Sequence, residues 1–141
     1  MMLESNKALI CQFIDIVINQ GRLDQIDHFV DAAIVDHNAG ADQAAGSAGY
    51  RQHLLGVRTT FPDFTLTVDA QFAEGDYVIT RVTGRGTHQQ AWLGITPRGT
   101  PVTVTGINID RVVNHKIVEH WGEADTVGML LQLGVTLTPL V

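Results

Sequence analysis

The chain reads KIVEHWGEADTVGMLLQLG from residue 116 to residue 134, and this stretch predicts a β-strand that runs into a short helix. Alternation along a strand places Glu119, Trp121, Glu123 and Asp125 on one face of a sheet. Acids beside a large aromatic ring make a poor dry core, so we expect this face to be the wall of a pocket. Asp125, at the corner between strand and helix, is the leading candidate for a general base. The same position also suits a helix N-cap, and both roles stay open.

The residues upstream predict helices first and strands afterwards. Helical periodicity is expected over residues 5–20, 23–30 and 47–60, and strands over residues 33–38, 64–72, 77–85, 102–113 and 116–125. Asn114 and His115 predict a two-residue hairpin turn. This order is typical of the α+β class. We expect N-terminal helices packed on a strongly curved, mostly antiparallel sheet, with a cone-shaped cavity between them that could hold a small molecule.

The composition narrows the functions to be considered. The 141 residues fit one domain, 1–141. The nine Lys and Arg are scattered in a chain of net charge −6, so we expect no nucleic-acid partner. No apolar run is long enough for a membrane span, and the N-terminus does not resemble a signal peptide, so we expect a cytoplasmic protein. Cys11 is the only cysteine and is expected to be a buried, unreactive thiol.

The sequence lacks the residue spacings and glycine motifs that are typical of metal and nucleotide sites. The sequence has no H-E-x-x-H or H-x-H spacing, and no glycine-rich phosphate loop follows a predicted strand. We therefore expect no metal and no cofactor. A serine nucleophile also lacks the G-x-S-x-G turn that would present it.

Several other side chains are candidates for the cavity. His88, beside two glycines, could polarise a substrate oxygen or be an exposed loop residue. His37 could line the same cavity, and Arg81 could pair with an acid of the last strand or face solvent. A bulge at Gly84 or Gly86 would be needed to bring Arg81 and His88 to one face. Trp92, Trp121, Tyr50 and Phe61 are candidate pocket walls, although helical core is also open for Tyr50 and Phe61. The other histidines, His28, His53, His115 and His120, are expected to be structural or solvated.

Four segments together carry a resemblance to a known family. They are Val35–Asn38, Gly86–His88, Leu93–Gly99, and the C-terminal pattern E-x-W-x-x-x-D-x-x-G-x-x-x-Q-L-G that starts at Glu119. The chain resembles the SnoaL-like polyketide cyclases, also called ester cyclases, of the nuclear transport factor 2-like fold. The resemblance implies intramolecular aldol condensation without metal or cofactor. It places the catalytic Asp at Asp125 and the strand His at His88, and it makes His37, Arg81, Asn108 and Trp121 cavity-lining residues.

Taken together, these features predict carbon-acid chemistry on a small hydrophobic carbonyl compound. The leading hypothesis is a polyketide cyclase-like aldol condensation with Asp125 as base. The alternative is a non-catalytic module of the same fold that binds a small ligand or a partner. An epoxide hydrolase would need an Asp–Arg–Asp-like set, of which only Asp125 and Arg81 are evident. We also expect a homodimer formed through the exposed sheet face, because strand 102–113 is rich in Thr and Val.

Overall fold

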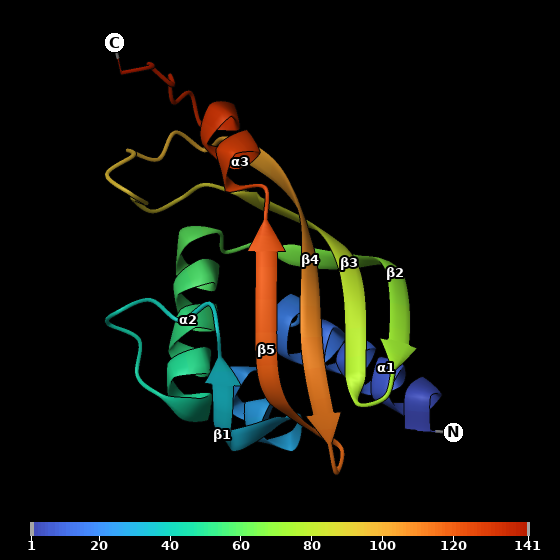
Figure 1. Cartoon of the computed structure of the whole chain (residues 1–141). Coiled ribbons are helices and arrows are strands. Elements are labelled where there is room, and N and C mark those ends of the chain that lie inside the picture. Colours follow the sequence, from blue (N-terminus) through green and yellow to red (C-terminus); the bar gives the residue numbers. More distant parts are fainter. Residues whose placement is uncertain (1, 141) are drawn as a thin grey trace.

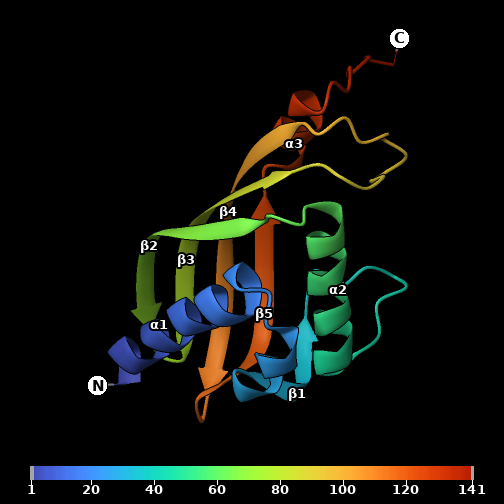
Figure 2. The same ribbon diagram turned by 180° about the vertical axis from the view of Figure 1, so that it is seen from behind.

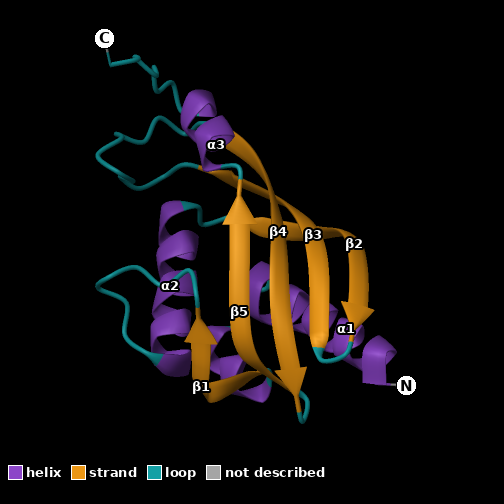
Figure 3. Cartoon of the chain, in the orientation of Figure 1, coloured by secondary structure: helices purple, strands orange, loops and turns teal. Residues whose placement is uncertain are grey.

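The computed structural model describes residues 2–140, which form five helical elements and a five-stranded sheet (Figures 1 and 3). The helical elements are α1 (Met2–Phe13), its π-helical continuation η1 (Ile14–Asn19), the 3-10 helix η2 (Leu23–His28), α2 (Gly46–Thr60) and the short α3 (Thr126–Gln132). The strands are β1 (Val30–Asp36), β2 (Thr65–Glu74), β3 (Tyr77–Thr87), β4 (Pro101–Val113) and β5 (Lys116–Ala124). Within residues 2–140, no helix is both long and apolar enough to cross a lipid bilayer.

The strands form one curved sheet in the order β1-β5-β4-β3-β2. β1 runs parallel to β5, and every other neighbouring pair is antiparallel. Seen from behind, α1 and α2 lie on one face of the sheet, which we call the inner face (Figure 2). No helix of residues 2–140 covers the opposite, outer face. This arrangement confirms the predicted α+β class with helices packed on a curved, mostly antiparallel sheet.

Local turn chemistry explains several boundaries. Asn114 and His115 both have positive φ, 50° and 59°, as the predicted two-residue hairpin between β4 and β5 requires. Gly21, with φ of 70°, follows the N-terminal helical segment and redirects the chain. The predicted strand 33–38 is displaced: β1 begins at Val30, because the preceding helix ends at His28 rather than at residue 30.

The main core lies between the helices and the inner face of the sheet. Alternation on β3 shows this directly, since Val78, Thr80 and Val82 are buried whereas Tyr77 and Ile79 are exposed. The buried core cluster comprises Ile10, Phe13, Ile14, Val17, Ile26, Phe29, Val30, Ile34, Tyr50, Val78, Val82, Val112 and Ile117. This core holds the helices at a fixed distance from the strands and so fixes the space left between them.

The structure corrects the prediction that Cys11 is buried. Cys11 is exposed, and its Sγ donates to Gln71 Oε1 at 3.2 Å. The buried side of α1 is formed by Asn6, Ile10 and Phe13. Cys11 is one residue beyond Ile10, which on a helix of 3.6 residues per turn carries it round toward the edge of the buried stripe.

Two neighbours on β1 test this orientation of the sheet. Ile34 is 3% exposed in the core, whereas Val35 is 51% exposed. We expect Ile34→Ala to lower the free energy of unfolding by about 2–5 kcal/mol, because it removes buried methyl groups and leaves a cavity. Val35→Ala is the control and should cost less than about 1 kcal/mol, the span of strand propensities. Urea unfolding of both variants checks this, and equal losses would contradict the assignment of faces.

Candidate functional site

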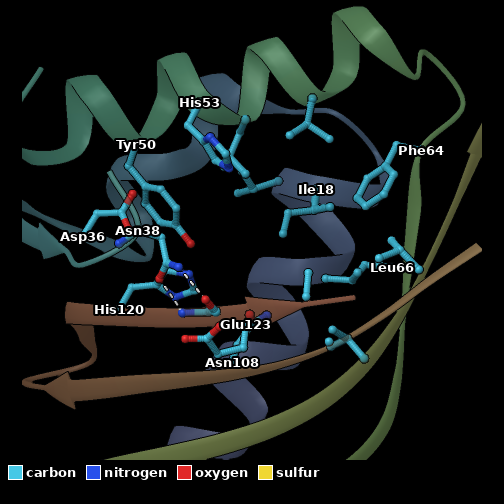
Figure 4. A pocket seen from close by; sticks show the side chains of 18 of the residues that line it. Ile18, Asp36, Asn38, Tyr50, His53, Phe64, Leu66, Asn108, His120 and Glu123 are labelled. Atoms are coloured by element: carbon cyan, nitrogen blue, oxygen red, sulfur yellow. Dashed lines mark hydrogen bonds between the residues drawn. The ribbon is translucent and has the colours of Figure 1, made fainter. Parts of the chain in front are cut away.

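A cavity of about 470 Å³ lies between α2, the N-terminal helical segments and the inner face of the sheet (Figure 4). One end is polar, with Asp36, Asn38, Tyr50 and His120 close together, and Phe64 and Leu66 lie at the other end. The apolar lining residues are Val17, Ile18, Leu23, Leu54, Val57, Phe64, Leu66, Val82 and Val104, and the larger polar ones are Asp36, Asn38, Tyr50, His53, Arg58, Asn108, His120 and Glu123. A mostly apolar cavity with a few convergent polar groups is typical of a small-molecule site.

His120 and Asp110 form a hydrogen-bonded pair at the polar end. They face each other across β5 and β4, and His120 Nδ1 lies 2.6 Å from Asp110 Oδ1. Because an ionised carboxylate can only accept, Nδ1–H is the donor, which leaves the lone pair of an uncharged ring on Nε2. Within residues 2–140, Nε2 has no hydrogen-bond partner. His120 is thus held in the tautomer that a general base needs.

Burial alone would lower the pKa of His120, but its neighbours reverse the effect. The hydrogen bond to Asp110 and the negative charges of Asp110 and Asp36 favour the imidazolium, and the pKa lies above the ordinary value of 6.5. The ring therefore accepts a proton more readily than a free histidine does.

Gly122 leaves the space in which His120 Nε2 and Asn108 meet. A Cβ at residue 122 would lie 2.9 Å from Asn108 Oδ1 and 3.3 Å from His120 Nε2. The amide oxygen and the ring nitrogen therefore both lie close to the bare backbone of Gly122 on the cavity wall. A ligand atom beside Gly122 could contact the imidazole and the amide together.

Residues just after β1 hold the backbone of β5 at His120 and at Gly122. Asn38 Oδ1 accepts from Gly122 N–H, and Asn38 Nδ2 donates to the carbonyl oxygen of the same residue. His37 N–H donates to the carbonyl oxygen of His120 at 2.9 Å. The side chain of Asn38 thus behaves as a further strand residue, and it fixes the wall on which His120 is mounted.

Tyr50 approaches the same end from α2. The sequence left open whether Tyr50 is a pocket wall or part of the helical core. It is both, because it lines the cavity and is also buried in the core cluster. Its ring centroid lies 5.4 Å from that of His120. Burial raises the pKa of Tyr50 well above 10.0, and the charges of Asp110 and Asp36 raise it further. The hydroxyl stays protonated and, with no partner among residues 2–140, can donate to a ligand.

His53 lies one turn further along α2 and points into the cavity (Figure 4). Burial lowers its pKa below 6.5, the charge of Asp36 partly offsets this, and His120 lowers it again. The pKa values of the two cavity histidines, His53 and His120, are therefore shifted in opposite directions.

Asp125 lies outside the lining of this cavity. It is exposed at the N-cap of α3, where its Oδ1 accepts from Gly128 N–H at 2.9 Å. The capping role left open by the sequence is confirmed. β5 ends at Ala124, and Ala124 and Thr126 on either side of Asp125 reach the cavity in its place. The catalytic role of Asp125 stays a prediction.

The predicted pocket face of β5 is corrected for Glu119 and Trp121, which lie on the outer face of the sheet, whereas Glu123 near the end of the strand lines the cavity. Trp121 stacks on His37 with ring centroids 4.4 Å apart and planes 6° apart, and His37 Nε2 lies 2.7 Å from Glu119 Oε2. Arg81 is on the same face, where it lies 3.5 Å from Asp69. The alternation was predicted correctly, but the buried face was the other one. These side chains border the outer surface and not the cavity between helices and sheet.

His88 and Trp92 are also absent from the cavity lining. His88 is 1% exposed just beyond β3, with its ring 5.7 Å from that of Phe61 and its Nε2 without a partner among the described residues. No bulge lies at Gly84 or Gly86, because β3 pairs with β4 without interruption as far as Thr87, so the device that would bring Arg81 and His88 to one face is not found. Trp92 is half-buried in the following loop.

Sequence reasoning missed the Asp110–His120 pair. His120 was expected to be structural because it alternates with the Glu119–Trp121 face that was assigned to the pocket. The hairpin turn at residues 114–115 was not a sufficient signal, because counting from it pairs Asp110 with Glu119, and only the register shift between Arg111 and Val112 brings Asp110 opposite His120. In the part of the chain that the structure describes, no cluster of three or more His, Cys, Asp or Glu side chains could hold a metal ion.

Several solved structures share this architecture. TsrD from Streptomyces laurentii is 28% identical over 91% of this chain and 93% of its own, with a TM-score of 0.82. IdmH from Streptomyces antibioticus, provisionally described as a polyketide cyclase, is 34% identical over 92% and 99%, with a TM-score of 0.81. AclR from Streptomyces galilaeus, provisionally described as a hydroxylase, is 31% identical over 94% and 97%, with a TM-score of 0.80.

No curated protein matches the sequence significantly. The family model for SnoaL-like polyketide cyclases matches residues 8–133, which include both β-strands of the His120–Asp110 pair and the whole of α3. This match spans most of the sequence, and it agrees with the architecture and with the resemblance of IdmH. The chain therefore belongs to the SnoaL-like polyketide cyclase family.

Proposed function

We propose that the cavity binds a small hydrophobic carbonyl compound and carries out cofactor-free carbon-acid chemistry on it, as a cyclase that closes a ring by intramolecular aldol condensation. The observation that carries this proposal is His120, whose Nδ1 is held by Asp110 while its Nε2 is free beside Asn108 and Gly122. A histidine oriented by a buried carboxylate is a suitable general base. The description of IdmH as a polyketide cyclase supports the same reaction class.

The proposed reaction begins with proton transfer from carbon to nitrogen. Nε2 removes a proton from the carbon beside the substrate carbonyl, and the Asp110 carboxylate stabilises the imidazolium that forms. The enolate carbon then attacks a second carbonyl of the same molecule, which forms the new C–C bond. The resulting alkoxide takes the proton back from the imidazolium, so that the histidine returns to its starting state.

Tyr50 supplies electrophilic assistance in this scheme. Its hydroxyl is neutral and faces the polar end of the cavity, where it can donate to the oxygen on which negative charge develops. A fixed donor of this kind, placed where negative charge develops, commonly lowers the activation barrier by a few kcal/mol. The apolar remainder of the cavity would hold the rest of the substrate folded for ring closure.

The base assignment predicts unequal effects of two substitutions. Proton abstraction can be followed by deuterium exchange from D2O into 2-tetralone, measured by NMR. We expect His120→Gln to slow exchange by about 10²–10⁴-fold, the usual contribution of a positioned base. Asp125→Asn should change it little and also keep α3 capped, because Asn serves as an N-cap as well as Asp does.

The reverse result would identify Asp125 as the base, as predicted from the sequence. No exchange by the wild-type protein above the rate in buffer would contradict carbon-acid catalysis altogether. That outcome would favour the alternative, a binding module whose apolar cavity retains a ligand. Native mass spectrometry of the purified protein would then be expected to show a bound small molecule.

The pKa shift of His120 predicts a pH profile. The base must be unprotonated, so exchange should rise with pH through the pKa of His120, above 6.5. Asp110→Asn removes both the ionic hydrogen bond and a negative charge that raise this pKa. We expect the midpoint to move to lower pH while the plateau rate falls. A rate profile of the two proteins checks this, and an unchanged midpoint would show that the titrating group is not His120.

We further propose that the chain forms a homodimer through the outer face of the sheet. An apolar groove there is bordered by Phe72, Tyr77, Ile79, Ile109 and Trp121, and Phe72 is 65% exposed. Exposed apolar patches of this kind commonly mark an interface.

The dimer is tested by the mass in solution. Sedimentation equilibrium should give about twice the 15.3 kDa of one chain. Ile79→Lys, in the middle of the groove, should shift the protein to the monomer because a charge would be buried without a partner. Leu55→Lys, at an exposed apolar position of α2, is the control and should leave the dimer intact. A wild-type mass of a single chain would contradict the proposal.

A further inference from the structure

Arg58 brings a fixed positive charge to the cavity. It lies in the last turn of α2 and lines the cavity near Phe64, which Figure 4 shows at the opposite end from Asp36. Its Nη1 donates to the carbonyl oxygen of Ile18 at 2.8 Å and lies 3.5 Å from that of Phe64. These contacts tie the guanidinium to two backbone segments, so its position does not depend on a mobile partner.

Gly21 makes room for this arrangement. A Cβ at residue 21 would lie 2.3 Å from Arg58 Nε and 2.6 Å from Cζ, so any side chain there would displace the guanidinium. Gly21 also has positive φ, which disfavours other residues at this position. The backbone turn after η1 is thus shaped around the head group of Arg58.

The charge of Arg58 is not balanced by the protein. Among residues 2–140, no carboxylate lies within 4.0 Å of it, and neither Nε nor Nη2 has a hydrogen-bond acceptor. The carboxylates that line the cavity, Asp36 and Glu123, lie close to His120 and Asn108 at the polar end (Figure 4). The cavity therefore has negative charge beside the proposed base and positive charge at its far, apolar end.

We propose that Arg58 binds an anionic carboxylate group of the substrate and so directs the carbonyl end of the same molecule toward His120. A cation beside apolar surface is costly without a counter-charge, and a guanidinium suits a carboxylate because its planar donors can bind both oxygens. An anion at the polar end would be repelled by Asp36 and Glu123. The substrate class is then an apolar carbonyl compound that bears a carboxylic acid. This inference rests on the proposed function only for the direction in which the ligand lies.

Binding of two matched probes tests the proposal. Naphthalene-2-carboxylate and naphthalene-2-carboxamide have nearly the same shape and differ in charge, and their dissociation constants can be measured by isothermal titration calorimetry. We expect the wild-type protein to prefer the carboxylate by about tenfold or more, equivalent to about 1.4 kcal/mol. Arg58→Met should weaken the binding of the carboxylate to the affinity of the carboxamide, and it should leave the affinity for the carboxamide unchanged. Arg58→Lys should keep part of the preference.

Arg51 supplies the matched control. It lies on the same helix but outside the cavity lining, where it pairs with Asp27 at 3.3 Å. Arg51→Met removes the same charge and should leave the preference for the carboxylate intact. Equal affinity of the wild-type protein for both probes, no saturable binding of the carboxylate, or a preference that survives Arg58→Met would each overturn the proposal. Circular dichroism shows whether the variants are folded. If Arg58→Met does not fold, the comparison of the two probes on the wild-type protein decides whether the proposal stands.

The same measurement on His120→Gln separates this inference from the proposed function. His120 lies at the other end of the cavity, so its loss should not change the preference for the carboxylate. If exchange chemistry fails while the preference persists, the anion site stands without the catalytic assignment. If the preference is absent while exchange depends on His120, the anion site is overturned alone.

Discussion

The pairing of β4 with β5 controls the chemistry of the cavity. The hairpin turn at residues 114–115 would by itself place Asp110 opposite Glu119, but the register shifts by one residue between Arg111 and Val112, and Asp110 pairs with His120. Because side chains alternate on a strand, a shift of one residue exchanges the two faces. The bulge therefore puts an acid and a histidine side by side on the inner face, and it sends Glu119 and Trp121 to the outer face. Without it the buried acid would lack its partner.

A buried acid at this position is stable only because it is paired. Asp110 is 4% exposed in a mostly apolar region, where an isolated carboxylate would be strongly disfavoured. The Nδ1–H of His120 supplies a hydrogen bond and, when the ring is protonated, an opposite charge. Burial raises the pKa of Tyr50 most, and the same negative charges that favour the imidazolium raise it further. Asp110 and Asp36 thus favour proton uptake by His120, and together with burial they favour the neutral, hydrogen-bond-donating form of Tyr50.

The architecture could be predicted from the sequence, because hydrophobic periodicity and turn residues are local signals. The strand predicted at residues 77–85 and the tight turn at Asn114 follow from neighbouring residues alone, and the structure confirms both, with the strand extended to Thr87. The choice between the two faces of β5 is different, because Glu119 and His120 are equally polar neighbours and the deciding bulge depends on how two strands twist together. Arg58 and Gly21 illustrate the same limit. Their contact joins the end of α2 to the turn after η1, and no spacing in the sequence indicates that these segments meet.

The residues that carry the resemblance to the family have a structural explanation of their own. Asp125 caps α3, and a side chain at Gly128 would meet the capping carboxylate, since a Cβ there would lie 2.2 Å from Asp125 Oδ2. Gln132 accepts from Thr103 N–H at 2.8 Å and donates to Thr103 O at 2.7 Å, which fastens α3 to β4.

Trp121, the remaining large residue of the motif, stacks on His37 and holds the end of β1 beside β5. The motif therefore builds the corner between β5 and α3 and the contact of β1 with the sheet. Those constraints hold the backbone of residues 120–124 in place, and the residues that alternate with the motif, His120 and Gly122, face the cavity. A pattern that specifies this scaffold can be shared by proteins whose cavity residues, and hence substrates, differ.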